Sequence, residues 1–359
     1  MADSELRTLN VNQMVYMLSS SYISLIKGNV PFKNFPSIML WGPPGVGKSQ
    51  GVRAIAAEIE DSTNKTVVVT DVRLLLFNPV DLRGIPTANE NKTLAVWLKP
   101  QIFQMDESDD VVNILFLDEI TAAPTSVQAA AYQITLDRTV GEHKLPENCI
   151  VIAAGNRVTD KSVSYNMPKA LANRLCHLEI KEDANSWHNW AVVNGIHHYI
   201  AGYIEYNSTS LNRFDGTELA FPTPRSWEMV SNILNNVSED ITEVYPMIAG
   251  CIGEHTANLL RKWVDVCVGI PSVEDIFEEG DGATPKEKEL QIALKSAMVS
   301  YARKHPRKEL IDNSIEYSCK MPWSFRGKLM QDYYRIPETR DILKENEVFK
   351  TAVEDGLKC

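Results

Sequence analysis

GPPGVGKS, residues 42–49, matches without a gap the pattern G-x-x-x-x-G-K-[ST] of phosphate-binding loops. The apolar run Ile38–Trp41 before it predicts a strand, and Gln50–Glu60 after it has the apolar spacing of a helix. In this order, the glycines let backbone N–H groups face a polyphosphate, and the helix N-terminus adds a partial positive charge. We expect Lys48 to reach the β- and γ-phosphates and the Ser49 hydroxyl to bind Mg²⁺. The residues predicted to contact the nucleotide here are Gly42, Pro43, Pro44, Gly45, Val46, Gly47, Lys48, Ser49 and Gln50.

The composition is that of an ordinary globular protein. Of 359 residues, 44% are hydrophobic and 23% are charged, which suits two or three domains with buried cores. The formal net charge of −11 argues against tight binding to nucleic acid, which needs clustered Lys and Arg. The start MADSE does not resemble a secretory signal, and no apolar run approaches the ~20 residues of a membrane span. We therefore expect a cytoplasmic protein with reduced thiols at Cys149, Cys176, Cys251, Cys267, Cys319 and Cys359, which lack CxxC spacing.

The stretch NILFLDE, Asn113–Glu119, is an apolar strand that ends in two adjacent carboxylates. A nucleotide hydrolase needs such a pair opposite its phosphate loop: Asp118 would hold the Mg²⁺ shell, and Glu119 would orient and polarise the attacking water. The alternative is a buried strand whose end meets solvent, where acids are common. Its position beyond a phosphate loop, in a strand–helix–strand–helix order, favours the hydrolase interpretation.

Three further polar residues are candidates for the nucleotide site, and each also has a purely structural interpretation. Asn156 follows the apolar strand Cys149–Ala154 and could position the water, or it could simply form a turn after Gly155. Arg174 lies between a short helix and the strand Leu175–Ile180, and in an enzyme acting alone it would be an exposed surface arginine. Arg225 opens a helix after a proline turn, either as a surface charge or as a phosphate contact from a lid.

The alternation of strands and helices gives way to nearly all helix after residue 182. We predict an α/β nucleotide-binding domain at residues 1–185, a helical lid at 186–275 and a helical C-terminal extension at 285–359. Within the first domain, Thr66–Asp71 has the composition of a buried parallel strand, and Pro79–Pro100 is a long, turn-rich connection. Histidines 188, 197 and 198 have apolar and aromatic neighbours without an acidic or thiolate partner at ligand spacing, which argues against a metal site.

The motifs GPPGVGKS, ILFLDE, AAGN, ALANRL and PTPRSW, in this order, resemble the nucleotide machinery of AAA+ ATPases. The segments Pro79–Pro100, Arg138–Pro146 and Trp187–Ile204 resemble the MoxR branch of that family, with CbbQ and NorQ proteins as near relatives. The resemblance covers about residues 10–240. The tail after about residue 285 carries no family signature, so the sequence does not identify the protein on which such an ATPase would act.

This resemblance implies an α/β fold, namely a P-loop AAA+ αβα sandwich with a five-stranded parallel sheet, followed by an all-helical lid and a helical C-terminal region. It implies ATP and Mg²⁺ as cofactors and a homo-oligomeric ring, most often a hexamer. It also implies a chaperone that remodels or activates a partner, commonly a protein with a von Willebrand factor A domain. The implied residue roles are Walker A for Lys48 and Ser49, Walker B for Asp118 and Glu119, first polar sensor for Asn156, arginine finger for Arg174, and second sensor on the lid for Arg225.

In the family arrangement, Arg174 would lie at the edge of the sheet, from which it cannot reach its own phosphate loop and must serve a neighbour. Alternatives to a remodelling ATPase are a DNA-directed AAA+ machine, such as a restriction or helicase subunit, and an ATP-gated scaffold without significant turnover. The acidic charge and the lack of a recognisable nucleic-acid module oppose the first, and the intact Glu119 opposes the second.

Overall fold

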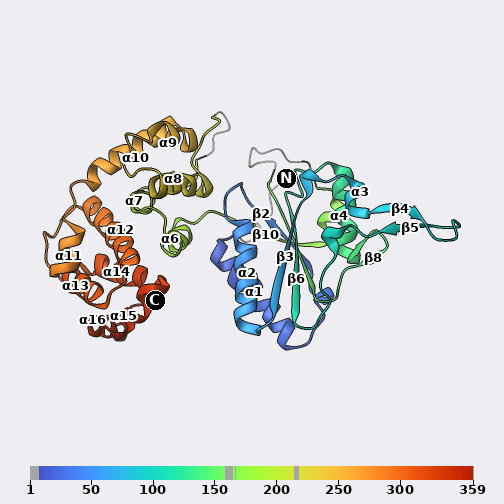
Figure 1. Ribbon diagram of the computed structural model, residues 1–359, viewed down its shortest axis with the longest axis horizontal. Coiled ribbons are helices and arrows are strands. Elements are labelled where there is room, and N and C mark those ends of the chain that lie inside the picture. Colours follow the sequence, from blue (N-terminus) through green and yellow to red (C-terminus); the bar gives the residue numbers. More distant parts are fainter. Residues whose placement is uncertain (1–7, 158–164, 166, 214–217, 359) are drawn as a thin grey trace. The chain divides into compact units, whose positions relative to one another are not determined.

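The phosphate loop follows a central strand of a parallel sheet. In the computed structural model, which describes residues 8–157, 165, 167–213 and 218–358, six strands form this sheet in the order β1-β10-β2-β9-β6-β3, and all neighbours are parallel (Figure 1). The strands are β1 (Thr8–Leu9), β2 (Ser37–Trp41), β3 (Thr66–Arg73), β6 (Val111–Asp118), β9 (Cys149–Gly155) and β10 (Leu175–Ile180). Because all run the same way, the ends of β2, β6 and β9 meet at one edge of the sheet.

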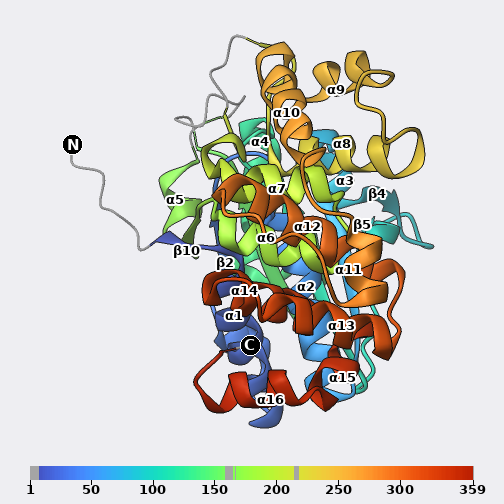
Figure 2. The ribbon, with the colours of Figure 1, turned by 90° about the vertical axis from the view of Figure 1, so that its left-hand side faces the viewer.

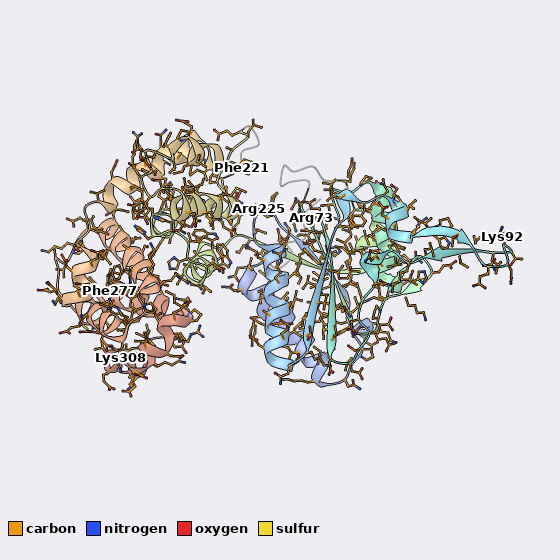
Figure 3. The ribbon with its side chains drawn as sticks, in the orientation of Figure 1. Arg73, Lys92, Phe221, Arg225, Phe277 and Lys308 are labelled. Atoms are coloured by element: carbon orange, nitrogen blue, oxygen red, sulfur yellow. The ribbon has the colours of Figure 1, made fainter. Side chains whose placement is uncertain are left out.

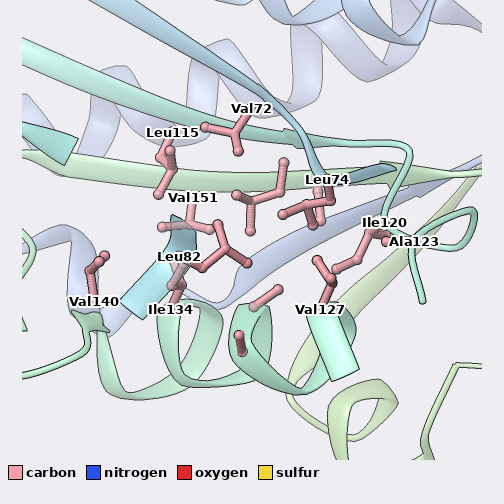
Figure 4. Packing of buried hydrophobic residues seen from close by; sticks show 14 of the residues in the cluster. Val72, Leu74, Leu82, Leu115, Ile120, Ala123, Val127, Ile134, Val140 and Val151 are labelled. Atoms are coloured by element: carbon pink, nitrogen blue, oxygen red, sulfur yellow. The ribbon is translucent and has the colours of Figure 1, made fainter. Parts of the chain in front are cut away.

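Helices cover both faces of this sheet. Alternate residues of a strand point to opposite faces, so Ile114 and Phe116 of β6 join a core with α1 (Val11–Lys27) and α2 (Lys48–Thr63). Their neighbour Leu115 points to the opposite face and joins a second core. Figure 4 shows this second core, where side chains of the sheet face those of α3 (Pro79–Arg83) and α4 (Thr125–Asp137), namely Val72, Leu115 and Val151 against Leu82, Val127 and Ile134. The predicted αβα sandwich is confirmed.

Two details of the predicted sheet are wrong. The sheet has a sixth strand, because the two residues of β1 pair with β10 beyond the five predicted strands. The segment Thr66–Asp71 is not a buried strand, since β3 lies at the other edge and pairs only with β6, leaving Val68 43% exposed. A run of β-branched residues indicates a strand, but it does not tell an edge strand from a central one.

The turn-rich segment Pro79–Pro100 after β3 contains a short helix and a hairpin. Asn78 and Asp81 form a capping box that starts α3, and a hairpin of β4 (Ile85–Ala88) and β5 (Ala95–Leu98) follows. Lys92 lies in the tip of this hairpin, which projects from the domain (Figure 3). A second, smaller hairpin of β7 (Thr139–Val140) and β8 (His143–Lys144) follows α4 and lies within the segment Arg138–Pro146.

The chain divides between Glu182 and Asp183 into two compact units. The described residues of the second unit contain helices and no strand, as predicted. Figure 2 shows α7, α10 and α12 of this unit packed together. Its helices are α6 (Ala184–Val193), α7 (His198–Tyr206), α8 (Pro224–Asn236), α9 (Tyr245–Ile252), α10 (Glu254–Cys267), α11 (Val273–Glu279), α12 (Lys288–Lys304), α13 (Lys308–Ser318), α14 (Trp323–Arg335), α15 (Pro337–Glu345) and α16 (Glu347–Glu354).

The second unit has two hydrophobic cores that share helices. Ala293 of α12 joins the core of the proposed lid, and Val192 of α6 joins the core of the proposed extension. The boundary between lid and extension within this unit stays a prediction. None of the helices in the described ranges is long and apolar enough to cross a bilayer. The predictions for the first seven residues and for Cys359 lie outside the described residues, and the other five cysteines are free thiols.

The histidines of the second unit are built into its packing. His188 has an acidic partner that is distant in sequence: its Nε2 lies 3.0 Å from Asp332, whose carboxylate also accepts from the Lys295 ammonium at 2.6 Å. Burial alone would raise the pKa of Asp332, but Lys295 and His188 hold it well below its usual range. Because an ammonium already occupies this cluster, it is a poor cation site. Burial lowers the pKa of His197 to about 3 and that of His198 to about 4, which keeps both rings neutral.

Candidate nucleotide-binding site

Residues 42–47 form a tight loop between β2 and the start of α2. Gly47 has a φ of 101°, a left-handed conformation that is unfavourable for residues other than glycine. A Cβ at Gly42 would collide with the carbonyl oxygen of Ile180 on β10. No side chain caps the N-terminus of α2, which leaves its first N–H groups available to a phosphate.

Lys48 connects this loop to the end of β9. Its side chain is only 8% exposed, and Nζ donates to the carbonyl oxygens of Gly42 at 2.5 Å and Pro43 at 3.0 Å. Nζ also donates to Oδ1 of Asn156 at 3.0 Å. The structure thus brings together two residues 108 positions apart in sequence. A buried ammonium that donates to these oxygen atoms can exchange some of them for phosphate oxygens.

The predicted magnesium ligands are also neighbours. The hydroxyl of Ser49 donates to Oδ2 of Asp118 at 3.0 Å, which joins the start of α2 to the end of β6. Mg²⁺ prefers oxygen ligands and usually combines one or two protein groups with water and substrate phosphates. A hydroxyl and a carboxylate fit this preference. No group of three or more His, Cys, Asp or Glu side chains suited to a metal occurs in the described part of the chain, and this kind of site does not need one.

Glu119 turns the chain away from β6. Its φ of 56° is left-handed, a conformation that costs a residue other than glycine on the order of 1–3 kcal/mol and that clusters at active sites. The backbone N–H of Glu119 donates to Oδ1 of Asp118 at 2.8 Å, so the carboxylate of one residue fixes the backbone of the next. This bond gives Asp118 Oδ1 a structural partner while Oδ2 faces Ser49.

Residues 37–177 match the family model described as "ATPase family associated with various cellular activities (AAA)". They form an AAA ATPase domain. The matched range includes the phosphate loop, Asp118, Glu119, Asn156 and Arg174, and the chain is therefore an ATP-hydrolysing enzyme.

Other comparisons add little to this assignment. No curated protein matches the chain in sequence. Among solved structures, PCH-2 of C. elegans is 14% identical over 71% of this chain and 68% of its own, with a TM-score of 0.35. A mutant RuvB of Thermotoga maritima is 15% identical over 80% of this chain and 82% of its own, with a TM-score of 0.38.

The prediction that Arg174 lies at the edge of the sheet is wrong. The strand that follows it, β10, lies between β1 and β2. Arg174 precedes Leu175, which pairs with Ser37 at the start of β2, whereas the phosphate loop begins where β2 ends. The five residues of β2 span about 17 Å at ~3.3 Å each, longer than an arginine side chain. The guanidinium of Arg174 lies 3.9 Å over the ring of Tyr132. Arg174 is thus separated from its own loop by the length of a strand.

Arg225 belongs to the second unit, so its predicted contact with the nucleotide stays a prediction. It is exposed near the start of α8, where Thr223 and Ser226 form a capping box (Figure 3). A rigid helix start presents the side chain in a defined direction, as a sensor on a lid would require.

Sequence reasoning missed two polar residues beside the AAA site. The pKa of Asp71 is raised above its usual range. Burial is the largest cause, and the nearby carboxylate of Asp118 is the second. Asp71 lies late in β3, the strand that pairs with β6, so its position at the same edge of the sheet was a usable signal. The second residue, Thr121, follows β6 and contacts the backbone of Asn156. No sequence motif marks it, because this contact depends on how two loops meet.

Proposed function

We propose that this chain couples hydrolysis of Mg²⁺-ATP to the remodelling, maturation or activation of a partner protein, in the manner of MoxR ATPases. The part of this proposal that concerns a partner protein rests on the two hairpins, β4–β5 and β7–β8. The hydroxyl of Ser49 and the carboxylate of Asp118 lie at the start of α2 and the end of β6, whereas the β4–β5 hairpin projects from the domain (Figure 1). We propose that the hairpins offer a partner protein a surface that is separate from the phosphate loop.

In the proposed reaction, Lys48 binds the β- and γ-phosphates, while Ser49 and Asp118 hold Mg²⁺, which neutralises phosphate charge when bound. Glu119 accepts a hydrogen bond from the attacking water and polarises it. Asn156 donates its amide to the γ-phosphate or to this water. Arg225 contacts the nucleotide from the lid, as the resemblance to AAA+ proteins implies.

The turn of the β7–β8 hairpin contacts the base of the β4–β5 hairpin. His143 Nε2 lies 2.8 Å from the carbonyl oxygen of Trp97, and a Cβ at Gly141 would collide with the carbonyl oxygen of Arg83. The segments Pro79–Pro100 and Arg138–Pro146, which both resemble MoxR proteins, therefore form one surface.

This hairpin surface has exposed apolar side chains. Ile85 is 62% exposed and Leu98 57%, and together with Leu76, which precedes the segment and is 74% exposed, they line a groove of about 470 Å³. Exposed apolar patches on a soluble domain commonly mark an interaction site. We propose that this surface faces the client or the central pore of a ring. The proposed client is a protein with a von Willebrand factor A domain, and the proposed assembly is a hexamer in the cytoplasm.

Replacing both Arg83 and Trp97 with Ala tests the hairpin surface. We expect basal ATPase activity to stay within about twofold of the parent, because neither residue contacts the phosphate loop, and stimulation by a von Willebrand factor A domain protein to be lost. The measurement is the rate of phosphate release with and without that protein. Tyr16→Ala, which removes an exposed aromatic side chain from α1, is the matched control. An equal loss of basal and stimulated activity would mean that the two residues only support the core.

A further inference from the structure

Thr121 makes two hydrogen bonds to the backbone of a single residue, Asn156. Its Oγ1 accepts from the N–H of Asn156 at 3.0 Å and donates to the carbonyl oxygen of Asn156, also at 3.0 Å. A hydroxyl is both a donor and an acceptor, so one side chain satisfies both backbone groups. Thr121 is only 2% exposed, which removes water as a competing partner.

The surroundings leave Thr121 little freedom to move. The N–H of Ile120 donates to the carbonyl oxygen of Ala154 at 2.9 Å, and the carbonyl oxygen of Thr121 accepts from the N–H of Tyr165 at 2.6 Å. A Cβ at Gly155 would lie 2.6 Å from Oγ1 of Thr121, so the loops after β6 and β9 approach as closely as glycine allows. Thr121 is therefore fixed by its own backbone and in turn fixes the backbone of Asn156.

Asn156 carries this constraint to the phosphate loop. Its Oδ1 accepts from Lys48 Nζ at 3.0 Å, so the contacts run from Thr121 through Asn156 to the lysine that would hold the phosphates. We propose that Thr121 is a positioning residue for ATP hydrolysis, which holds Asn156 where its amide can meet both Lys48 and the reacting phosphate or water. This inference rests on the sensor role proposed for Asn156. Thr121 itself touches neither nucleotide nor water in this proposal.

The inference predicts different effects for two substitutions. Thr121→Val keeps the shape of the side chain but removes both hydrogen bonds, and we expect kcat to fall about tenfold, the equivalent of about one hydrogen bond in the transition state. The nucleotide Kd should change less than about twofold, because Lys48 and the loop remain. Thr121→Ser keeps the hydroxyl and should retain kcat within about twofold.

The test measures kcat from phosphate release and Kd with a fluorescent ATP analogue, in the parent and Asn156→Ala backgrounds. If Thr121 acts through Asn156, Thr121→Val should add no further loss to Asn156→Ala. An additive loss, an equal loss in the Val and Ser variants, or parental kcat in Thr121→Val would each overturn the inference. Thermal unfolding identifies a misfolded Val variant, in which case Thr121→Ala is compared with Thr121→Ser in the same two backgrounds.

The same data separate this inference from the proposed function. If Asn156→Ala turns over ATP at the parental rate, the sensor assignment is wrong and Thr121 cannot act through it. If Asn156→Ala is slow while Thr121→Val is as fast as the parent, the sensor assignment stands and only the positioning role of Thr121 is overturned.

Discussion

Lys48→Ala is expected to lose nucleotide binding. Lys48 Nζ is a buried charge that donates to three oxygen atoms at the mouth of the loop, and no other cation contacts those atoms in the described structure. Two charge-assisted hydrogen bonds to phosphates, at about 1.5–3 kcal/mol each, correspond to binding about 10²–10⁴-fold weaker. The measurement is a titration with a fluorescent ATP analogue in the presence of Mg²⁺.

The matched control for this experiment is Lys92→Ala, which removes an exposed lysine from the tip of the β4–β5 hairpin. Thermal unfolding without nucleotide shows whether the Lys48 variant is folded, because the carbonyl oxygens of Gly42 and Pro43 lose their donor. Parental affinity in a folded Lys48→Ala protein would contradict the assignment of this loop as the nucleotide site.

Arg174→Ala is expected to bind ATP normally but to turn it over slowly. A phosphoryl transition state spreads negative charge over the γ-oxygens, and an arginine supplied there is worth about 10³–10⁵ in rate in GTPases. Arg174 lies a strand's length from its own phosphate loop, so we propose that it acts on the nucleotide of a neighbouring chain. Each active site would then need two chains, and specific activity should rise with protein concentration.

Mixing variants tests this action between chains. Lys48→Ala chains keep Arg174, and Arg174→Ala chains keep Lys48, so some interfaces in a mixture pair an intact loop with an intact arginine. We expect the mixture to recover part of the lost hydrolysis. Lys169→Ala, which removes an exposed cation from the helix α5 (Lys169–Ala172) just before Arg174, is the matched control and should keep parental turnover. A fully active monomer, or no recovery despite proven co-assembly, would contradict the proposal.

The parts of the fold that the sequence predicts are those with local signals. Ile38–Trp41 and Asn113–Glu119 are apolar runs long enough to identify strands, and the loop between the first strand and its helix has a specific glycine pattern. The parallel order places their ends at one edge, so the contact between Ser49 and Asp118 follows from topology.

The features that the sequence does not predict depend on long-range pairing. The two residues of β1 are too few to show any periodicity, and they become a strand only because β10 offers a partner. The partnership of His188 with Asp332 joins residues 144 positions apart, which no spacing rule detects. The position of Arg174 was wrong for the same reason, since the place of β10 in the sheet is set by pairing rather than by chain order.

The hydrolytic role of Glu119 is tested most directly by comparing ATP binding and ATP turnover in Glu119→Gln. Glutamine keeps the size of the side chain but lacks the carboxylate that polarises water, while Ser49 and Asp118 remain to hold Mg²⁺. Binding of the fluorescent ATP analogue and phosphate release are measured on the same protein with Mg²⁺. We predict a Kd within about twofold of the parent and turnover lower by about 10²–10⁴-fold, the usual contribution of a general base. Hydrolysis of ATP by Glu119→Gln as fast as by the parent would contradict the assignment of Glu119 as the residue that polarises the attacking water.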